Sequence, residues 1–550
     1  MNLYIYIYKT FHLVTPIQNK KKGINIEQIS KRSASMSDTE MSAVAVAAAI
    51  VVVTAVAVWI WKGLNMAWLR PKNQEACLKR QGLSGTPFTF LVGDARREAS
   101  MVEQAKSRPI SLTDDYMPRI IPLILQTVKD HGKTTYMWMG PKASVIVTKL
   151  EHIKEVLNRV YDFPKPPKHP VVELFATGVA LCDGEKWSKH RKIINPSFHL
   201  EKLKVMTPAF YESCSEMTSK WERLVSEQGS SNEIDIWPYL CDVTSDVISR
   251  TAFGSSYEEG NRIFELQEEQ GRRLLKALEL AFIPGLRFLP TKNNMRMWQI
   301  DREVRSRLKE IIMKRQRAMV SGEAPKNDLL GILLESNSGD HGMSIEDVIE
   351  ECRLFHFAGH ETTAVLLVWT MIMLSHHKQW QDQAREEILE VIGKTNKPNF
   401  DTLSRLKIMS MIVNEVLRLY PPGKLLGRTI EKETKLGEDM TLPGGAQVVI
   451  PVLMIHRDPE LWGEDAHEFK PERFSEGISK ATKNQVSYLP FGWGPRFCPG
   501  QNFALMEAKM ALVLIMQRFS FELSPSYTHA PHMVLTLHPQ FGAPLIFHML

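Results

Sequence analysis

Hydrophobic and polar residues divide the chain into one uninterrupted apolar run and a long body of amphipathic segments. The run spans residues 43–61, AVAVAAAIVVVTAVAVWIW, and contains no charged residue and one polar residue, Thr54. As a helix it would be roughly 30 Å long, enough to cross the hydrocarbon core of a bilayer. A secretory signal has a shorter apolar core and a cleavage site, whereas this run ends in Trp59, Trp61 and Lys62. The pattern therefore predicts a retained membrane anchor.

The body that follows shows mostly helical spacing, with a few short runs of β type. Ser344 and Asp347 form a capping-box pattern at the start of the longest predicted helix. The predicted helices span residues 344–374, 378–392, 404–420 and 501–518, and the predicted strands lie at 136–139, 144–148 and within 441–452. These elements predict a mainly α fold with small β-sheets, in the α+β class.

The same patterns predict four segments along the chain: an N-terminal extension over 1–40, the anchor over 41–62, a linker over 63–87 and one domain over 88–550. Pro71 ends the helical pattern in the linker, and Gly85-Thr86-Pro87 marks a turn. Residues 1–40 resemble neither a signal sequence nor a folded unit. We expect them to be disordered or an error of the gene model, with translation starting at Met36 or Met41.

Basic residues are more numerous after the apolar run than before it, which predicts that the body faces the cytosol. Those within about 20 residues of the run are Lys22, Lys31 and Arg32 before it, and Lys62, Arg70, Lys72, Lys79 and Arg80 after it. The six cysteines are scattered with no CxxC pair, which also favours a reducing compartment.

Composition excludes several classes of protein. The 550 residues are 44% hydrophobic and 24% charged, unlike a disordered, collagen-like or multi-span membrane chain. The formal net charge of +6 is modest for this length, so no nucleic-acid partner is predicted.

The segment FGWGPRFCPG, residues 491–500, places Cys498 between glycines and directly before the last predicted helix. Backbone amides at a helix start favour a thiolate over a thiol, and a thiolate is the ligand with which iron cleaves an O–O bond. A single loop cysteine is more often an inert structural thiol. The surrounding spacing changes this, because Phe491, Gly494, Arg496, Cys498 and Gly500 resemble the FxxGxRxCxG signature of the cytochrome P450 family.

That resemblance extends over roughly residues 75–550 and includes three further motifs in the same order. It implies the cytochrome P450 fold with one N-terminal transmembrane helix, and a heme b whose iron has Cys498 as its axial ligand. Phe491 would contact the same cofactor.

Residues 358–363, AGHETT, form an unusual centre for a long helix, because glycine and adjacent threonines weaken a helix interior. A kink is the simpler explanation. Glycine also allows a ligand to approach the backbone, and an acid beside a hydroxyl can relay protons. The motif resembles the family's oxygen-activation sequence, which implies that Glu361 and Thr362 deliver protons and that Gly359 lies against the cofactor.

Glu415 and Arg418 share one helix face at i,i+3 spacing, which for an isolated pair usually means a surface ion pair. Arg473, in PERF, lies between this helix and Cys498. By resemblance the three would form the family's structural Glu-Arg-Arg network behind the heme.

Trp187 and Arg191, one helical turn apart, would otherwise be interpreted as a packing pair. They resemble the family's WxxxR motif, which reaches the heme propionates, and Arg428 and Arg496 occupy two further propionate-contacting positions. His456 is a lower-ranked polar neighbour of the cofactor. Several cations would anchor two carboxylates well.

Several stretches, among them LRPKNQEACLKRQGLSG, EKWSKHRKIINPSFHLEKLK and IPGLRFLPTK, resemble the plant secologanin-synthase-like group, which oxidises terpenoids. One departure concerns the substrate pocket: Gly423 to Gly427 replaces bulky aliphatic residues, and Lys424 either turns to solvent or pairs with an oxygen of the substrate. Pro499 replaces a commoner aliphatic residue, without consequence for heme binding.

The resemblance implies a monooxygenase of the endoplasmic reticulum membrane that oxidises a lipophilic terpenoid, triterpenoid or hormone-like molecule. Its partners would be membrane lipid and a flavoprotein reductase that supplies electrons from NADPH, since the sequence shows no glycine-rich nucleotide loop of its own. Two alternatives remain. One is a reductase-independent isomerase or dehydratase of lipid hydroperoxides, which would not need Glu361 and Thr362. The other is a non-catalytic membrane-tethered binder, in which loss of Cys498 or of the Glu-Arg-Arg set would be expected.

Overall fold

A computed structural model describes residues 38–166, 170–229, 231–254, 257–279, 289–323, 328–336, 342–438 and 440–550. Two compact units share the chain, Met1–Met66 and Ala67–Leu550. The predicted extension, up to residue 37 and including Met36, lies outside the described residues. So does most of IPGLRFLPTK in the second unit.

The first unit contains the helix α3 (Asp38–Leu64), which includes the whole predicted anchor. Its apolar side chains from Val46 onward are exposed within the chain, and Trp59 retains 74% of its surface. Apolar surface of this extent needs a non-aqueous neighbour. Among the described residues, a second helix is long and apolar enough to cross a membrane, α16 (Ile345–His376), but 72% of its apolar window is buried inside the protein. It is a core helix.

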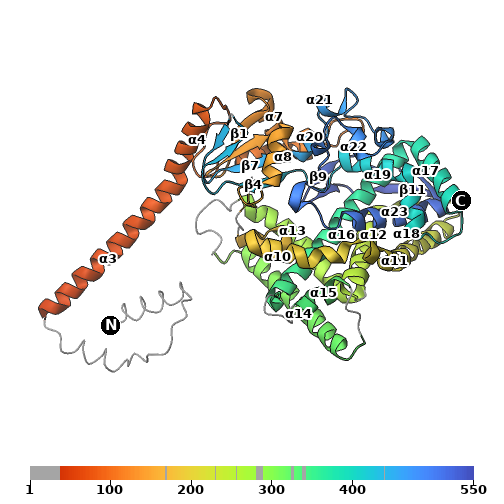
Figure 1. The fold of residues 1–550 in the computed structure, drawn as a ribbon, viewed down its shortest axis with the longest axis horizontal. Helices are drawn as coiled ribbons and strands as arrows, with labels where there is room; N and C mark the ends of the chain where they lie inside the picture. The colour runs from red at the N-terminus through yellow and green to blue at the C-terminus, as the bar shows by residue number, and fades with distance from the viewer. Residues whose placement is uncertain are drawn as a thin grey trace. The chain divides into compact units, whose positions relative to one another are not determined.

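The second unit is mostly helical, which agrees with the predicted fold class (Figure 1). A π-helical turn, η1 (Asn65–Leu69), precedes it. Its described helices are α4 (Arg70–Arg80), α5 (Ala95–Lys106), α6 (Met117–Ile120), α7 (Pro122–His131), α8 (Leu150–Asn158), α9 (Pro170–Glu173), α10 (Gly184–Ile194), α11 (Leu200–Ser226), α12 (Ile236–Ile248), α13 (Tyr257–Glu279), α14 (Lys292–Val320), α15 (Leu329–Ser336), α16, α17 (Lys378–Val391), α18 (Phe400–Arg405), α19 (Lys407–Leu419), α20 (Val452–Ile455), α21 (Pro459–Trp462), α22 (Ile478–Ala481) and α23 (Gln501–Arg518).

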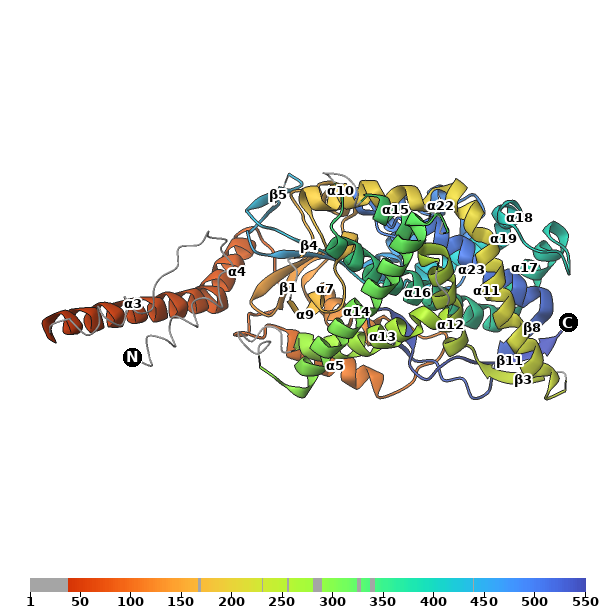
Figure 2. The same cartoon turned by 90° about the horizontal axis from the view of Figure 1, so that it is seen from below.

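Four small sheets complete this unit. The largest has the order β1 (Thr134–Met139), β2 (Lys142–Val147), β7 (Gln447–Ile450) and β4 (Leu426–Thr429), and in it β1 and β2 form the predicted hairpin. The other sheets are β3 (Ser231–Asp235) with β11 (Pro544–Met549) and β8 (Phe519–Leu523), β5 (Thr434–Leu436) with β6 (Met440–Leu442), and β9 (Pro531–Met533) with β10 (Leu537–Pro539). The sheet that holds β1 and β4 occupies one end of this unit in both views, and the long helices occupy the rest (Figures 1 and 2).

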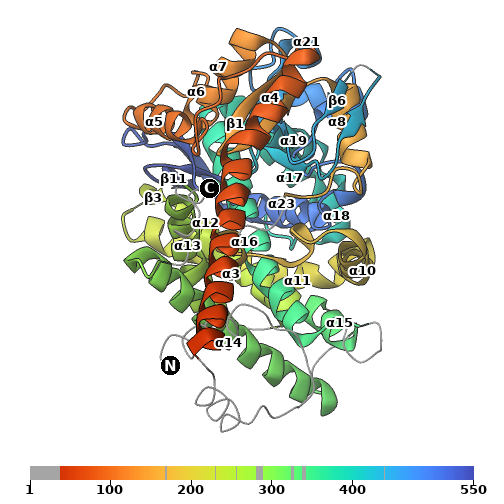
Figure 3. The same cartoon turned by 90° about the vertical axis from the view of Figure 1, so that its left-hand side faces the viewer.

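The helix α16 forms the centre of the larger hydrophobic core. Its capping box is present as predicted, because Ser344 and Asp347 exchange side-chain bonds with each other's backbone N–H groups. It packs against α12, α14, α19 and α23. The helices α14 and α15 lie at the opposite end of the unit from β1 and α7 (Figure 3). Residues 363–375 are all buried, whereas residues 357–360 and 362 keep partial accessibility, so this helix is open on one side at its middle.

Two predictions from the sequence are wrong. Residues 63–87 are not a linker, because Pro71 begins α4 rather than ending a helix, and Gln74 of α4 bonds to Ala143 and Gly444 of the body. The predicted helix over 404–420 is two helices that meet at Leu406, which adopts an extended conformation. The carboxylate of Glu387 on α17 accepts from the first three N–H groups of α19 and so satisfies the new helix start.

Candidate functional site

The loop that carries Cys498 is folded tightly against α8. The N–H of Cys498 donates to the carbonyl oxygen of Phe491 at 2.8 Å, which closes the loop on itself. Gly494 has a φ of 70°, and a Cβ atom there would lie 2.8 Å from the carbonyl oxygen of Leu157. Glycine is therefore required at this position, both for its backbone conformation and for the close approach of α8.

Cys498 is a free thiol that keeps partial accessibility, in a loop whose residues are all partly accessible or exposed. Burial raises the pKa of this thiol, and this effect is stronger than the opposing effects of the Gly500 N–H and the Arg191 guanidinium. The N–H at the helix start thus favours the thiolate in the direction expected from the sequence, but burial outweighs it. A thiolate at Cys498 would be stabilised by binding a metal ion, because a coordinating thiol loses its proton to the metal.

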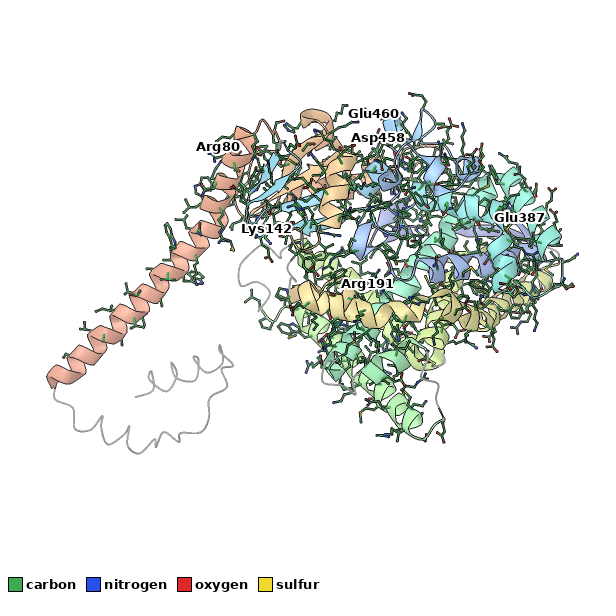
Figure 4. The ribbon with its side chains drawn as sticks, in the orientation of Figure 1. Arg80, Lys142, Arg191, Glu387, Asp458 and Glu460 are labelled. Atoms are coloured by element: carbon green, nitrogen blue, oxygen red, sulfur yellow. The ribbon has the colours of Figure 1, made fainter. Side chains whose placement is uncertain are left out.

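Arg191 and Trp187 approach this loop from α10, where Figure 4 labels Arg191. Arg191 donates to the carbonyl oxygen of Phe497 at 2.6 Å, and its guanidinium lies 5.0 Å from the centroid of that ring. Trp187 stacks under Arg496, with 4.4 Å between the guanidinium carbon and the ring centroid. The two residues of the predicted WxxxR motif thus contact the two residues that directly precede Cys498 in the loop.

Three cations gather beside the loop, one of them buried and two partly buried. Arg428 and Arg496 were expected there from the sequence, whereas Lys165, in the segment after α8, was not. Arg496 pairs with Asp183 and donates to the carbonyl oxygen of Cys182 at 3.0 Å. Burial and the two neighbouring guanidinium groups lower the pKa of Lys165 to about 7, and burial with Arg496 lowers that of Arg428 to about 10.

The three cations carry more positive charge than the one carboxylate beside them neutralises. Asp183 is the carboxylate that acts on each of the three cations, and the Nε atoms of Arg428 and Arg496 are buried without a hydrogen-bond partner. Unpaired buried charge is unstable. Two carboxylates of a bound cofactor would neutralise the surplus and occupy the open donors, so these residues fit a heme whose propionates lie here and whose iron lies at Cys498.

The Glu-Arg-Arg set is brought together and almost fully satisfied. Arg418 donates to both carboxylate oxygens of Glu415, at 2.7 and 2.8 Å, and neither residue is exposed. The Nε of Arg473 lies 3.7 Å from Glu415, and its two terminal nitrogens donate to the carbonyl oxygens of Trp462 and Asp465. The network ties α19 to the segment that leads to the Cys498 loop.

His456 belongs to this network rather than to the cofactor site, contrary to the expectation from the sequence. Its ring is fully buried, its Nε2 accepts from the N–H of Leu489 at 2.8 Å, and its Nδ1 lies 3.0 Å from the carbonyl oxygen of Arg418. Burial and Arg418 lower its pKa to about 3, so the ring is neutral.

Gly359 lies where α16 packs against α12, and its contact with the cofactor stays a prediction. A Cβ atom at this position would lie 2.7 Å from the Cδ1 of Ile248 on α12. The missing side chain therefore permits two core helices to pack closely, and a cofactor contact is not needed to explain it.

The middle of α16 holds Glu361 and Thr362 in different surroundings. The hydroxyl of Thr362 donates to the carbonyl oxygen of Ala358 at 2.7 Å, and the side chain is partly accessible. Glu361 is buried and accepts hydrogen bonds from Thr536 at 2.5 Å and His538 at 2.8 Å. Sequence reasoning missed both partners, because they lie about 175 positions away in a short strand pair with no motif of its own.

Lys424 does not turn to solvent. It is partly buried, and its ammonium group donates to the carbonyl oxygen of Ile120 at 3.0 Å. Burial lowers its pKa while the nearby carboxylate of Glu98 raises it. The charge is thus accommodated by α5 and α6, so no oxygen of a substrate is needed to explain Lys424.

Comparison with known proteins agrees with this geometry. The family model described as cytochrome P450 matches residues 122–541. Cytochrome P450 72A13 from Arabidopsis thaliana is 58% identical over 490 residues, which cover 88% of this chain and 95% of the relative. Cytochrome P450 72A552 from Barbarea vulgaris is 59% identical over the same shares, and cytochrome P450 CYP72A219 from Panax ginseng is 54% identical over 495 residues, again 88% and 95%.

The role of Cys498 can be tested by its replacement with alanine. The Cys498→Ala protein should lose the strongly red-shifted Soret band of the reduced, CO-bound form, because that band requires a thiolate on the iron. The matched control is Cys182→Ala, which removes a buried thiol elsewhere in the protein. The backbone carbonyl oxygen of residue 182, which accepts from Arg496, stays in place. A red-shifted band that persists in Cys498→Ala would assign the iron ligand to another residue.

Proposed function

The chain belongs to the cytochrome P450 family, which makes it a heme-thiolate monooxygenase of the plant CYP72 group, and we propose that it oxidises a lipophilic terpenoid or hormone-like molecule at a membrane. The observation that supports this substrate class is the apolar surroundings of the accessible stretch of α16. Phe175 packs edge-on against Phe357 at 4.7 Å, and Phe264 lies 5.2 Å from His360. Such walls favour an apolar molecule.

We assign heme binding to the residues that surround the Cys498 loop. Cys498 would ligate the iron, Lys165, Arg428 and Arg496 would hold the two propionates, and Trp187 and Arg191 would fix the loop that joins these functions. When bound, heme supplies the electron transfers that activate dioxygen. The protein contributes orientation, charge and protons.

Proton delivery is assigned to Glu361 and Thr362. Each reaction cycle that inserts one oxygen atom and releases the other as water consumes two protons. A carboxylate and a hydroxyl at adjacent positions of α16, where the helix is partly accessible, can hold and pass protons. An isomerase or dehydratase would not need this pair, so its presence favours the monooxygenase.

Electrons are proposed to come from NADPH through a separate flavoprotein reductase, as the family resemblance implies. We further propose that α3 anchors the enzyme in the endoplasmic reticulum membrane with the body in the cytosol. Support comes from the exposed apolar side chains of α3 and from Lys62 in its last turn, because basic residues collect on the cytosolic side.

The relay can be tested with Thr362→Ala. This variant should bind CO normally but release peroxide instead of product, with the yield of product per NADPH reduced by about tenfold or more. Thr370→Ala is the matched control, because Thr370 makes the same bond to the carbonyl oxygen four residues before it, deeper in the same helix. Coupled turnover in Thr362→Ala would contradict the assignment.

The substrate class can be tested by spectral titration of the purified enzyme with a panel of terpenoids, triterpenoids and hormone-like acids. An apolar ligand that displaces water from the iron should shift the Soret band to shorter wavelength in a saturable way. The panel should include small polar phenolics as a control. Saturable shifts with the phenolics alone would reject a lipophilic substrate.

A further inference from the structure

Two polar contacts fasten the β9–β10 strand pair to α16. Trp369 donates to the carbonyl oxygen of Leu537 at 2.7 Å, and Glu361 contacts Thr536 and His538. Oε1 of Glu361 accepts from the hydroxyl of Thr536 at 2.5 Å and lies 2.8 Å from Nε2 of His538. Thr536 and His538 are themselves 3.0 Å apart, so the three side chains form a closed triangle. His538 pairs with His532 across the strands, which fixes its direction.

The triangle lies in apolar surroundings but is not sealed. The side chain of His538 keeps 14% of its surface and that of Glu361 keeps 10%. The ring of Trp237 on α12 lies 4.8 Å from the His538 ring and covers part of it. A hydrogen bond between an acid and an imidazole in such a place is strong and directional.

Other titratable groups near Glu361 are less suited to supply a proton. Burial lowers the pKa of His360, and burial with the neighbouring His538 lowers that of His532 to about 4, so both rings are neutral near pH 7. The thiol of Cys241 on α12 is protonated, because burial raises its pKa. Asp242 and Glu268, from α12 and α13, act on the same group of residues as anions.

Glu361 itself is held as a carboxylate. Burial raises its pKa, but the hydrogen bonds from His538 and Thr536 lower it by more, so that the pKa lies below its usual value. An acid in this state cannot give up a proton until it has received one. A donor must therefore stand next to it, and His538 is in contact.

We propose that His538, positioned by Thr536, is the proton donor that reloads Glu361 during dioxygen activation. The inference rests on the proposed relay of Glu361 and Thr362. In the step, the imidazolium of His538 breaks its Nε2–H bond, a new O–H bond forms at Oε1 of Glu361, and a neutral imidazole with its proton on Nδ1 remains. A hydronium ion of the solvent then returns a proton to Nε2 and becomes water, and no electron moves. Loss of both charges weakens the contact and leaves the protonated carboxyl group able to donate.

The test uses the heme-loaded full-length enzyme and three variants. His538→Gln keeps an N–H donor for Glu361 but cannot carry a proton near neutral pH, and Thr536→Val removes the positioning hydroxyl. The control is His548→Gln, which alters a second His–Glu contact, 3.4 Å from Glu522 in the β8–β11 sheet.

Two measurements distinguish proton donation from a structural role. The ratio of peroxide to product should rise at least about tenfold in His538→Gln, with an unchanged KM. The infrared carboxyl band that disappears in Glu361→Gln should titrate at a different pH in His538→Gln and Thr536→Val, but not in His548→Gln.

An unchanged peroxide ratio and an unchanged carboxyl titration in His538→Gln would reduce the triangle to a packing contact. A raised KM with a lowered melting temperature would lead to the same conclusion, because it would show that the strand pair had come away from α16. If NADPH consumption by Thr362→Ala is fully coupled to product formation, the proposed relay of Glu361 and Thr362 is itself wrong. If Thr362→Ala is uncoupled and His538→Gln is not, this inference alone fails.

Discussion

Buried positive charge is the constraint around which the site is arranged. Lys165, Arg428 and Arg496 come from the segment after α8, from β4 and from the Cys498 loop, three parts of the chain that meet at one place. Their charges repel one another and have left water, which is costly unless anions come close. Asp183 supplies part of the compensation. On the proposed assignment, the two propionates of a bound heme would supply the remainder.

The Glu415 network illustrates the opposite situation. Arg418 is as deeply buried as any residue of the protein, yet its donors end on Glu415 and on backbone carbonyl oxygens of the segment 456–468. Nothing is left over for a ligand. Arg418 therefore holds the framework behind the loop, whereas Arg428 and Arg496 each leave a buried Nε for a cofactor. His456, which the sequence placed beside the cofactor, lies with Arg418 because both of its ring nitrogens are already used.

Local patterns predicted local structure well. The boundaries of α23 agree with those expected, and α16 and the β1–β2 hairpin differ by a few residues, since capping residues, prolines and glycines mark them directly. Residues that act through tertiary contact could not be found in this way. Lys165 cannot be told from the other lysines in the sequence, because its proximity to Arg428 and Arg496 appears only in the folded protein. In the same way, the contact of His538 with Glu361 exists only because β10 lies against α16. The same limit explains α4, whose polar sequence resembles a linker until Gln74 bonds to two distant backbone groups.

The central claim is that the buried cations exist to hold an anionic cofactor, and heme retention tests it most directly. Transfer of heme to excess apomyoglobin should be followed from about pH 6 to about pH 9 in the native enzyme, in Lys165→Gln and in the exposed control Lys204→Gln. Heme bound nearby raises the pKa of Lys165 above its value of about 7, so its stabilisation is complete at the lower pH and is lost as the pH rises. The account predicts that Lys165→Gln loses heme about tenfold faster at the lower pH and shows little dependence on pH, while Lys204→Gln behaves as the native enzyme does. Equal rates of heme loss in all three proteins at every pH would contradict it.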